Sequence, residues 1–292
     1  MRRALRLSII SWLGVLVYAW AVPSMAAEPS RFTVSVTGQG PDIILIPGLA
    51  TSGDVWDATV KQLAPAHRVH VIRVRGFGGL DSGVNAGEGD ILPALINEVA
   101  RYADGLQRPA IVGHSIGGLI ALEVAARRPG AVSRLLIVDA LPFYSLTITP
   151  AASVEMMRPM AATLRTQVLE QGDTQWVTNA PMTASRLVKT DDGLQLVAKW
   201  TAASDWIVVG KMMAENMLTD ARRDLPNITA HTTVLYAFDE SMGVSLTTVA
   251  SMFRTAYIGL PGVTLKRIDD TYHFIMLDQP DVFAREVDAF LK

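Results

Sequence analysis

The stretch Ala110-Ile-Val-Gly-His-Ser-Ile-Gly-Gly-Leu-Ile-Ala-Leu122 runs from an apolar segment through Gly-x-Ser-x-Gly into a helical pattern. A sharp strand-to-helix turn strains the backbone at Ser115 and leaves little room two residues away, which explains Gly113 and Gly117. The N-terminus of the following helix directs partial positive charge at an oxyanion beside Ser115. The pattern predicts an exposed nucleophilic serine between a strand and a helix. The alternative is a glycine-rich turn with an incidental serine, so the setting of the motif has to decide.

The composition indicates one large domain. The chain has 292 residues, and half of them are hydrophobic. That is enough for one sizeable α/β domain with an insertion, rather than for two independent domains. The chain contains no cysteine, which excludes disulfides and thiolate chemistry. Its stability therefore has to come from packing alone.

Residues 1–26 have the pattern of a secretory signal peptide. Three arginines precede the apolar run 7–22 and small residues follow it, so cleavage after Ala26 or Ala27 fits. The alternative is an uncleaved membrane anchor, since the run is only slightly shorter than a spanning helix. Loss of the three arginines changes the formal net charge from −2 to −5, which argues against a nucleic acid partner. We expect a bacterial protein of the periplasm or the medium, without stable membrane association after cleavage.

Apolar and alternating runs separated by helical patterns organise the rest of the chain. The predicted strands are 32–36, 42–46, 69–74, 109–112, 135–138, 232–237 and 263–268, and the predicted helices include 54–63, 91–106, 244–257 and 280–291. Strands that alternate with helices predict a mostly parallel sheet, with ligands at the carboxyl ends of its strands.

Residues 141–226 carry helical patterns without a buried-strand signal, which predicts a helical cap inserted into the α/β unit. Seven of the twelve methionines lie here, and polarisable thioethers over a cleft suit an apolar substrate. We expect Trp206 and Met213 to line the substrate pocket, although ordinary core packing is the alternative for any single residue. The predicted organisation is a signal peptide (1–26), a core (27–140 with 227–292) and a cap (141–226).

An activated serine needs a base, and the chain offers five histidines. They are His67, His70, His114, His231 and His273. Three of them lie at or near the N-terminal ends of predicted strands, and His114 sits on the turn itself, where neighbouring side chains diverge. His273 follows the last predicted strand, on the same edge as Ser115. We therefore expect His273 to be the base, with a structural hydrogen-bonding histidine as the alternative.

The base needs an acid that fixes its tautomer and stabilises the imidazolium. Asp239 and Glu240 follow the strand 232–237, and Asp139 follows the strand 135–138. Asp239 is favoured because it gives the chain order serine, acid, histidine. Asp139 and Glu240 remain alternative acids, with simpler roles at the start of the cap or as a solvated loop charge.

A developing oxyanion requires two preorganised backbone donors. The turn Pro47-Gly48-Leu49 follows a buried strand and is expected to face Ser115. The candidate donors are the amides of Leu49 and Ile116. The bare backbone of Gly48 allows close approach of a substrate, although a plain turn glycine is the alternative.

These residues resemble the α/β-hydrolase family. The resemblance rests on Ile46-Pro-Gly-Leu, Gly113-His-Ser-Ile-Gly-Gly, the acid at Asp239, and His273-Phe with the downstream Gln279-Pro, and it extends from about residue 32 to the C-terminus. It implies an α/β fold with a mostly parallel eight-stranded sheet flanked by helices, a helical cap after the sixth strand, and a Ser-His-Asp triad. Members with an aspartate nucleophile are disfavoured because Ser115 occupies that position.

Together these features predict an exported serine hydrolase, and specifically a carboxylesterase that cleaves small or medium apolar esters through an acyl-enzyme. Such a reaction requires no metal and no organic cofactor. The same triad also cleaves amides, lactones or carbon–carbon bonds, and a non-catalytic protein of the same fold that binds a small ligand is a further alternative. The sequence leaves the oligomeric state open.

Overall fold

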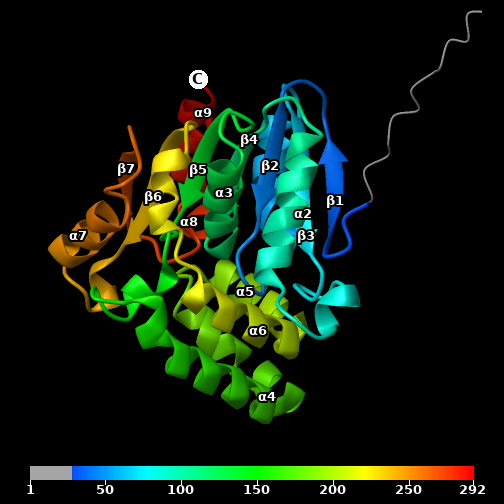
Figure 1. The fold of residues 1–292 in the computed structure, drawn as a ribbon, viewed down its shortest axis with the longest axis vertical. Coiled ribbons are helices and arrows are strands. Elements are labelled where there is room, and N and C mark those ends of the chain that lie inside the picture. The colour runs from blue at the N-terminus through cyan, green and yellow to red at the C-terminus, as the bar shows by residue number, and fades with distance from the viewer. Residues whose placement is uncertain (1–27) are drawn as a thin grey trace, which may run out of the picture.

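A computed structural model describes residues 28–292 of the protein, so the predicted signal peptide lies outside the described residues. The seven predicted strand runs all form strands, in one sheet of order β1-β3-β2-β4-β5-β6-β7 (Figure 1). The strands are β1 (Phe32–Thr37), β2 (Asp42–Ile46), β3 (Arg68–Val74), β4 (Ala110–His114), β5 (Arg134–Val138), β6 (His231–Phe238) and β7 (Thr264–Asp269). β1 is antiparallel to β3, and every other pair is parallel.

Within the described residues the sheet has seven strands, not the eight that the resemblance implied. The helical insertion correspondingly follows β5, the fifth strand of this chain, rather than a sixth. The first strand run, 32–36, pairs directly with β3 at the sheet edge, and no further strand precedes it in the described part.

Helices cover both faces of the sheet, which explains why every residue of β2 and of β4 is buried. Successive side chains of a strand point to opposite faces: Ile44 and Ile46 pack in one hydrophobic cluster, whereas Ile43 and Leu45 pack in the other. The first cluster includes side chains of α2 (Leu92–Asp104), α3 (Ile116–Arg127) and α7 (Leu246–Ala256). The second includes side chains of α1 (Asp57–Leu63), α8 (Ile275–Asp278) and α9 (Pro280–Leu291).

Three further helices form the cap, at the end of the sheet where the parallel strands finish (Figure 1). They are α4 (Val154–Ser185), α5 (Asp191–Ala203) and α6 (Trp206–Leu218). α4 packs against both α5 and α6 and is interrupted at Gly172, whose φ of 73° breaks the helical geometry. The predicted absence of strands in 141–226 is confirmed. None of the described helices is long and apolar enough to cross a membrane.

The cap is held to the core by charged groups of α6. The Glu215 carboxylate accepts the N–H groups of Ile91 and Leu92 at the start of α2, where helix amides lack intrahelical partners. The Lys211 ammonium donates to the Gly87 carbonyl at 2.7 Å. Burial raises the pKa of Glu215. These contacts anchor α6 over the loop between β3 and α2.

Candidate active site

Ser115 occupies a strained turn between β4 and α3. Its φ of 55° and ψ of −126° lie in a region that L-residues rarely adopt. A Cβ on Gly113 would collide with the carbonyl of Gly117, and a Cβ on Gly117 would collide with the carbonyl of Ile46. Both glycines are therefore required by close backbone packing. The local structure is the strand, turn and helix that the motif predicted.

The turn after β2 lies directly against Ser115. A Cβ on Gly48 would come within 2.8 Å of His114 Nδ1 and 3.2 Å of Ser115 Cβ. Among the turn and loop hydrogen bonds of the described residues, the amides of Leu49 and Ile116 have no backbone acceptor. The amides of Leu49 and Ile116 therefore stay the candidates for the two donors that an oxyanion requires.

A cap residue supports this turn. The buried Ser204 hydroxyl lies between α5 and α6, 3.3 Å from the carbonyl of Ala50. Ala50 itself has a positive φ of 53°. The same hydroxyl accepts the N–H of Gly78 at 2.8 Å. The cap thus contacts the strained backbone next to Leu49.

His273 lies in the loop between β7 and α8, and its Nδ1 is 2.7 Å from Asp139 Oδ2. An Nδ1–H donated to this carboxylate leaves Nε2 as the acceptor, which is the tautomer that a general base needs. The His273 side chain is 24% exposed, so the imidazole is only partly covered by the surrounding chain.

Asp139 ends β5, next to the strand that carries Ser115. Its second oxygen, Oδ1, accepts the N–H of Ala237 at 2.9 Å, so each carboxylate oxygen has a defined partner. The Ser115 N–H donates to the Val138 carbonyl at 3.0 Å, which ties the turn to the residue before Asp139. Asp139 adopts a φ of 44°, which is rare for an L-residue.

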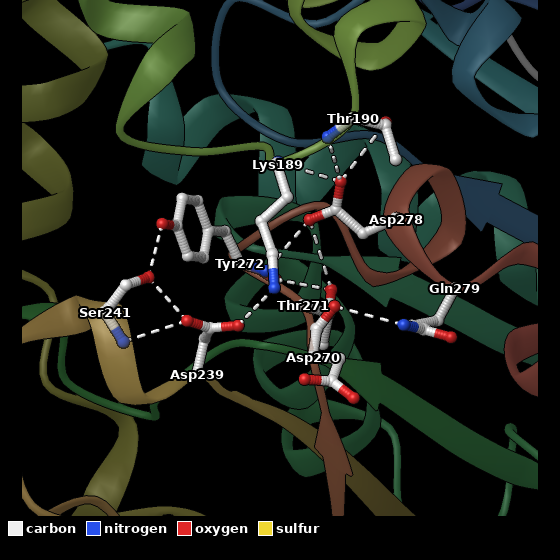
Figure 2. Close-up of polar contacts among 9 residues, drawn as sticks. All are labelled: Lys189, Thr190, Asp239, Ser241, Asp270, Thr271, Tyr272, Asp278 and Gln279. Carbon is white, nitrogen blue, oxygen red and sulfur yellow. Dashed lines mark hydrogen bonds and ion pairs between the residues drawn. The ribbon is translucent and has the colours of Figure 1, made fainter.

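The structure places Asp139, the alternative acid, against His273 in place of the favoured Asp239. Asp239 Oδ2 pairs with Lys189 Nζ at 2.5 Å, and Oδ1 accepts both the hydroxyl and the N–H of Ser241 (Figure 2). Hydrogen bonding to Lys189, followed by that to Ser241, lowers the pKa of Asp239 to about 2. Glu240, the other alternative, is exposed at the start of a short 3-10 helix.

His114 contributes a contact that its position in the motif did not reveal. Its fully buried ring lies 4.6 Å from the ring of His273, and its Nε2–H donates to the His273 carbonyl at 3.0 Å. Burial and the neighbouring His273 hold the pKa of His114 well below its usual value. A neutral His114 therefore fixes the backbone of the His273 loop without competing for the proton.

Trp206 and Met213 both lie on α6 and are partly exposed. The cap methionines are divided: Met157, Met212 and Met217 are buried, whereas Met156, Met160 and Met182 are exposed. Burial alone does not separate core from pocket among these methionines, and the pocket role of Trp206 and Met213 stays a prediction. The described residues contain no group of three side chains arranged to hold a metal ion.

Ser115, the His273–Asp139 pair and the candidate amides of Leu49 and Ile116 lie at the end of the sheet where the parallel strands finish. The cap covers this end. The model of the Alpha/beta hydrolase family matches residues 43–286, which includes all of these groups. The chain belongs to the alpha/beta hydrolase family.

Relatives of this alpha/beta hydrolase include esterases. The chain is 34% identical over 120 residues to the pimeloyl-[acyl-carrier protein] methyl ester esterase of Aeromonas salmonicida, an alignment that covers 41% of this chain and 44% of the relative. It thus matches less than half the length of that relative.

Among solved structures, the enol-lactonase of Burkholderia xenovorans superposes with a TM-score of 0.70 at 20% identity, covering 89% of this chain and 96% of the other. A thermophilic esterase of Thermogutta terrifontis gives a TM-score of 0.69 at 19% identity, covering 89% and 92%. At this identity the two structures support the fold alone.

Proposed function

We propose that this alpha/beta hydrolase is a serine carboxylesterase in which Ser115 is the nucleophile, His273 the base and Asp139 the acid. The observation that carries the proposal is the 2.7 Å contact between His273 and Asp139, in a loop that also touches the ring next to Ser115. This contact accounts for the orientation of the imidazole, and the turn geometry accounts for the exposure of the hydroxyl.

In the proposed reaction the Ser115 hydroxyl attacks the ester carbonyl while His273 Nε2 takes its proton. The amides of Leu49 and Ile116 stabilise the oxyanion. His273 then returns the proton to the leaving alkoxide, which departs as an alcohol and leaves an acyl group on Ser115. Water, deprotonated by His273, hydrolyses the acyl-enzyme. Asp139 stabilises the imidazolium in both halves of the cycle.

The proposed substrates are small or medium esters with an apolar acyl group. Support comes from the apolar and thioether side chains of the cap and from an esterase among the partial relatives. Lactones and amides pass through the same tetrahedral chemistry, so they belong in the same substrate panel.

The test is pre-steady-state hydrolysis of p-nitrophenyl acetate, butyrate and octanoate. We expect an initial burst of p-nitrophenol that approaches one equivalent per active site where deacylation is slower than acylation, followed by steady turnover. The Ser115→Ala variant should show neither phase. If the folded protein turns over no ester in the panel, a ligand-binding role gains support over the enzyme.

Export remains a separate proposal, based only on the sequence of residues 1–26. N-terminal sequencing of the protein from a bacterial host should yield a chain that starts after Ala26 or Ala27. An intact N-terminus in the membrane fraction would favour the anchor instead.

A further inference from the structure

Asp278, at the end of α8, joins the loop of His273 to the cap. Its side chain is buried, with 9% of the residue exposed, although it carries a carboxylate. A buried carboxylate is tolerated only where hydrogen-bond donors replace its lost hydration. The donors around Asp278 come from two segments that lie far apart in the sequence (Figure 2).

One oxygen binds the cap. Asp278 Oδ1 accepts the N–H of Lys189 at 2.9 Å, the N–H of Thr190 at 3.1 Å and the Thr190 hydroxyl at 3.3 Å. These residues form the linker between α4 and α5, and Thr190 is the N-cap of α5. Oδ1 therefore fixes the point where the two cap helices meet.

The other oxygen binds the loop of His273. Asp278 Oδ2 accepts the N–H of Tyr272 at 2.9 Å and the fully buried Thr271 hydroxyl at 3.3 Å. Tyr272 immediately precedes His273. On the other side of His273, the Phe274 N–H donates to the Leu187 carbonyl at 3.1 Å, which ties the loop to the same cap linker.

The Lys189 side chain adds a second connection. Its ammonium pairs with Asp239 at the end of β6, and Asp239 binds Ser241, whose hydroxyl contacts the Tyr272 hydroxyl at 2.6 Å. Thus the backbone of the linker binds Tyr272 through Asp278, and the Lys189 side chain reaches the same residue through Asp239 and Ser241 (Figure 2).

We propose that Asp278 is a positioning residue that locks the His273 loop to the cap linker 187–190, and thereby holds His273 against Asp139. The proposal rests on the function proposed above and deepens it, because it makes the base depend on the cap. Asp278 has no hydrogen bond to Ser115 or His273, and it acts through the backbone of Tyr272, which precedes His273.

The arrangement requires a carboxylate rather than an amide. Both oxygens of Asp278 face N–H donors, so a side-chain amide could satisfy only one segment and would turn its own NH2 toward the donors of the other. Asp278→Asn thus keeps the volume and breaks one half of the lock. Asp278→Ala breaks both halves and leaves buried amides without an acceptor.

The experiment compares the unsubstituted protein with D278N and D278A. D281N, an exposed acid three residues further along, is the matched control. The readouts are kcat and KM for p-nitrophenyl acetate, the pH dependence of kcat/KM, and the low-field proton NMR signal of the His273 Nδ1–H. D278N is close to isosteric, so it serves if D278A fails to fold.

We expect D278N to lower kcat about tenfold or more while KM changes little. The pH profile of kcat/KM should change, because a looser contact with Asp139 stabilises the imidazolium less. The low-field signal should weaken or shift in D278N and stay unchanged in D281N. A folded D278N with normal kcat, pH profile and NMR signal, even at a lower Tm, would overturn the proposal. The NMR comparison holds even if no ester is turned over, so it separates the failure of this inference from that of the esterase.

Discussion

The carboxylates of Asp139 and Asp239 lie at the ends of neighbouring strands, and their partners give them different roles. Asp139 binds an imidazole and a backbone amide, which leaves its charge available to stabilise an imidazolium. Asp239 already neutralises the ammonium of Lys189. A charge that is compensated by a fixed cation contributes little to a second partner, so only Asp139 is suited to orient His273.

Substitution of the two acids by their amides should therefore have unequal effects. Asp139→Asn should lower kcat on p-nitrophenyl acetate by about 10⁴-fold, because the amide favours the wrong tautomer of His273. Asp239→Asn should lower kcat far less than Asp139→Asn does, because Asp239 binds Lys189 and Ser241 rather than His273. Equal losses in the two variants, or a larger loss in Asp239→Asn, would return the role of the acid to Asp239.

The pKa of Asp239 gives a prediction on stability. A pKa of about 2 in the folded protein, against an ordinary unfolded value of about 3.9, means that the ionised pair stabilises the fold above pH 4. This contribution should decrease as the pH falls from about 4 to about 2. Urea unfolding should show Asp239→Asn less stable than the unsubstituted protein at pH 7, with the difference shrinking at acid pH. A constant difference across that range would mean that the pair contributes no pH-dependent stability.

Among the elements, α6 and the α4–α5 linker decide how the cap is attached. α6 is anchored by Glu215 and Lys211 on the side of β3, and the linker is anchored by Asp278 on the side of β7. The cap therefore contacts the core at several separated points, which include these two and the contact of Ser204 with Ala50. Side chains of α6 between these points are the best candidates to contact an acyl chain.

The cap should set the preference for acyl length. A buried methylene is worth about 1 kcal/mol, so Trp206→Ala or Met213→Ala should shift relative kcat/KM among acetyl, butyryl and octanoyl esters by about tenfold. Met160→Ala is the control, because Met160 is 46% exposed on α4. If Trp206→Ala and Met213→Ala change kcat/KM by the same factor for all three esters, these side chains serve core packing rather than the pocket.

The strands and the serine turn could be predicted because their signals are local. The apolar run of β4, the two glycines and the helical pattern of α3 lie within eighteen residues, and their periodicity fixes the order of the elements. The acid depends on partners that local patterns do not contain. Asp139 and Asp239 both end strands at the same edge, and only the folded chain places Lys189 beside Asp239. The strand order could not predict the pairing of Lys189 with Asp239, because Lys189 belongs to the inserted cap.

For the molecule as a whole, the insertion after β5 brings residues more than 80 positions apart onto one loop. Lys189 and Thr190 of the cap bind Asp278, and Asp139 at the start of the insertion binds His273. The sheet alone would place the strand ends side by side, but the His273 loop is also tied to the cap, through the Leu187 carbonyl and through Asp278. The candidate site is therefore formed by the core and the cap together.

The most direct measurement is the site and stoichiometry of phosphonylation by a fluorophosphonate, read by intact mass and peptide mapping. The unsubstituted protein should gain one phosphonyl group, on Ser115 alone, because the proposed mechanism assigns the base and the oxyanion donors to this hydroxyl. Ser115→Ala should keep its unfolding midpoint and gain none. Labelling that persists at another residue in Ser115→Ala, or a folded unsubstituted protein that remains unlabelled, would contradict the assignment of Ser115 as the nucleophile.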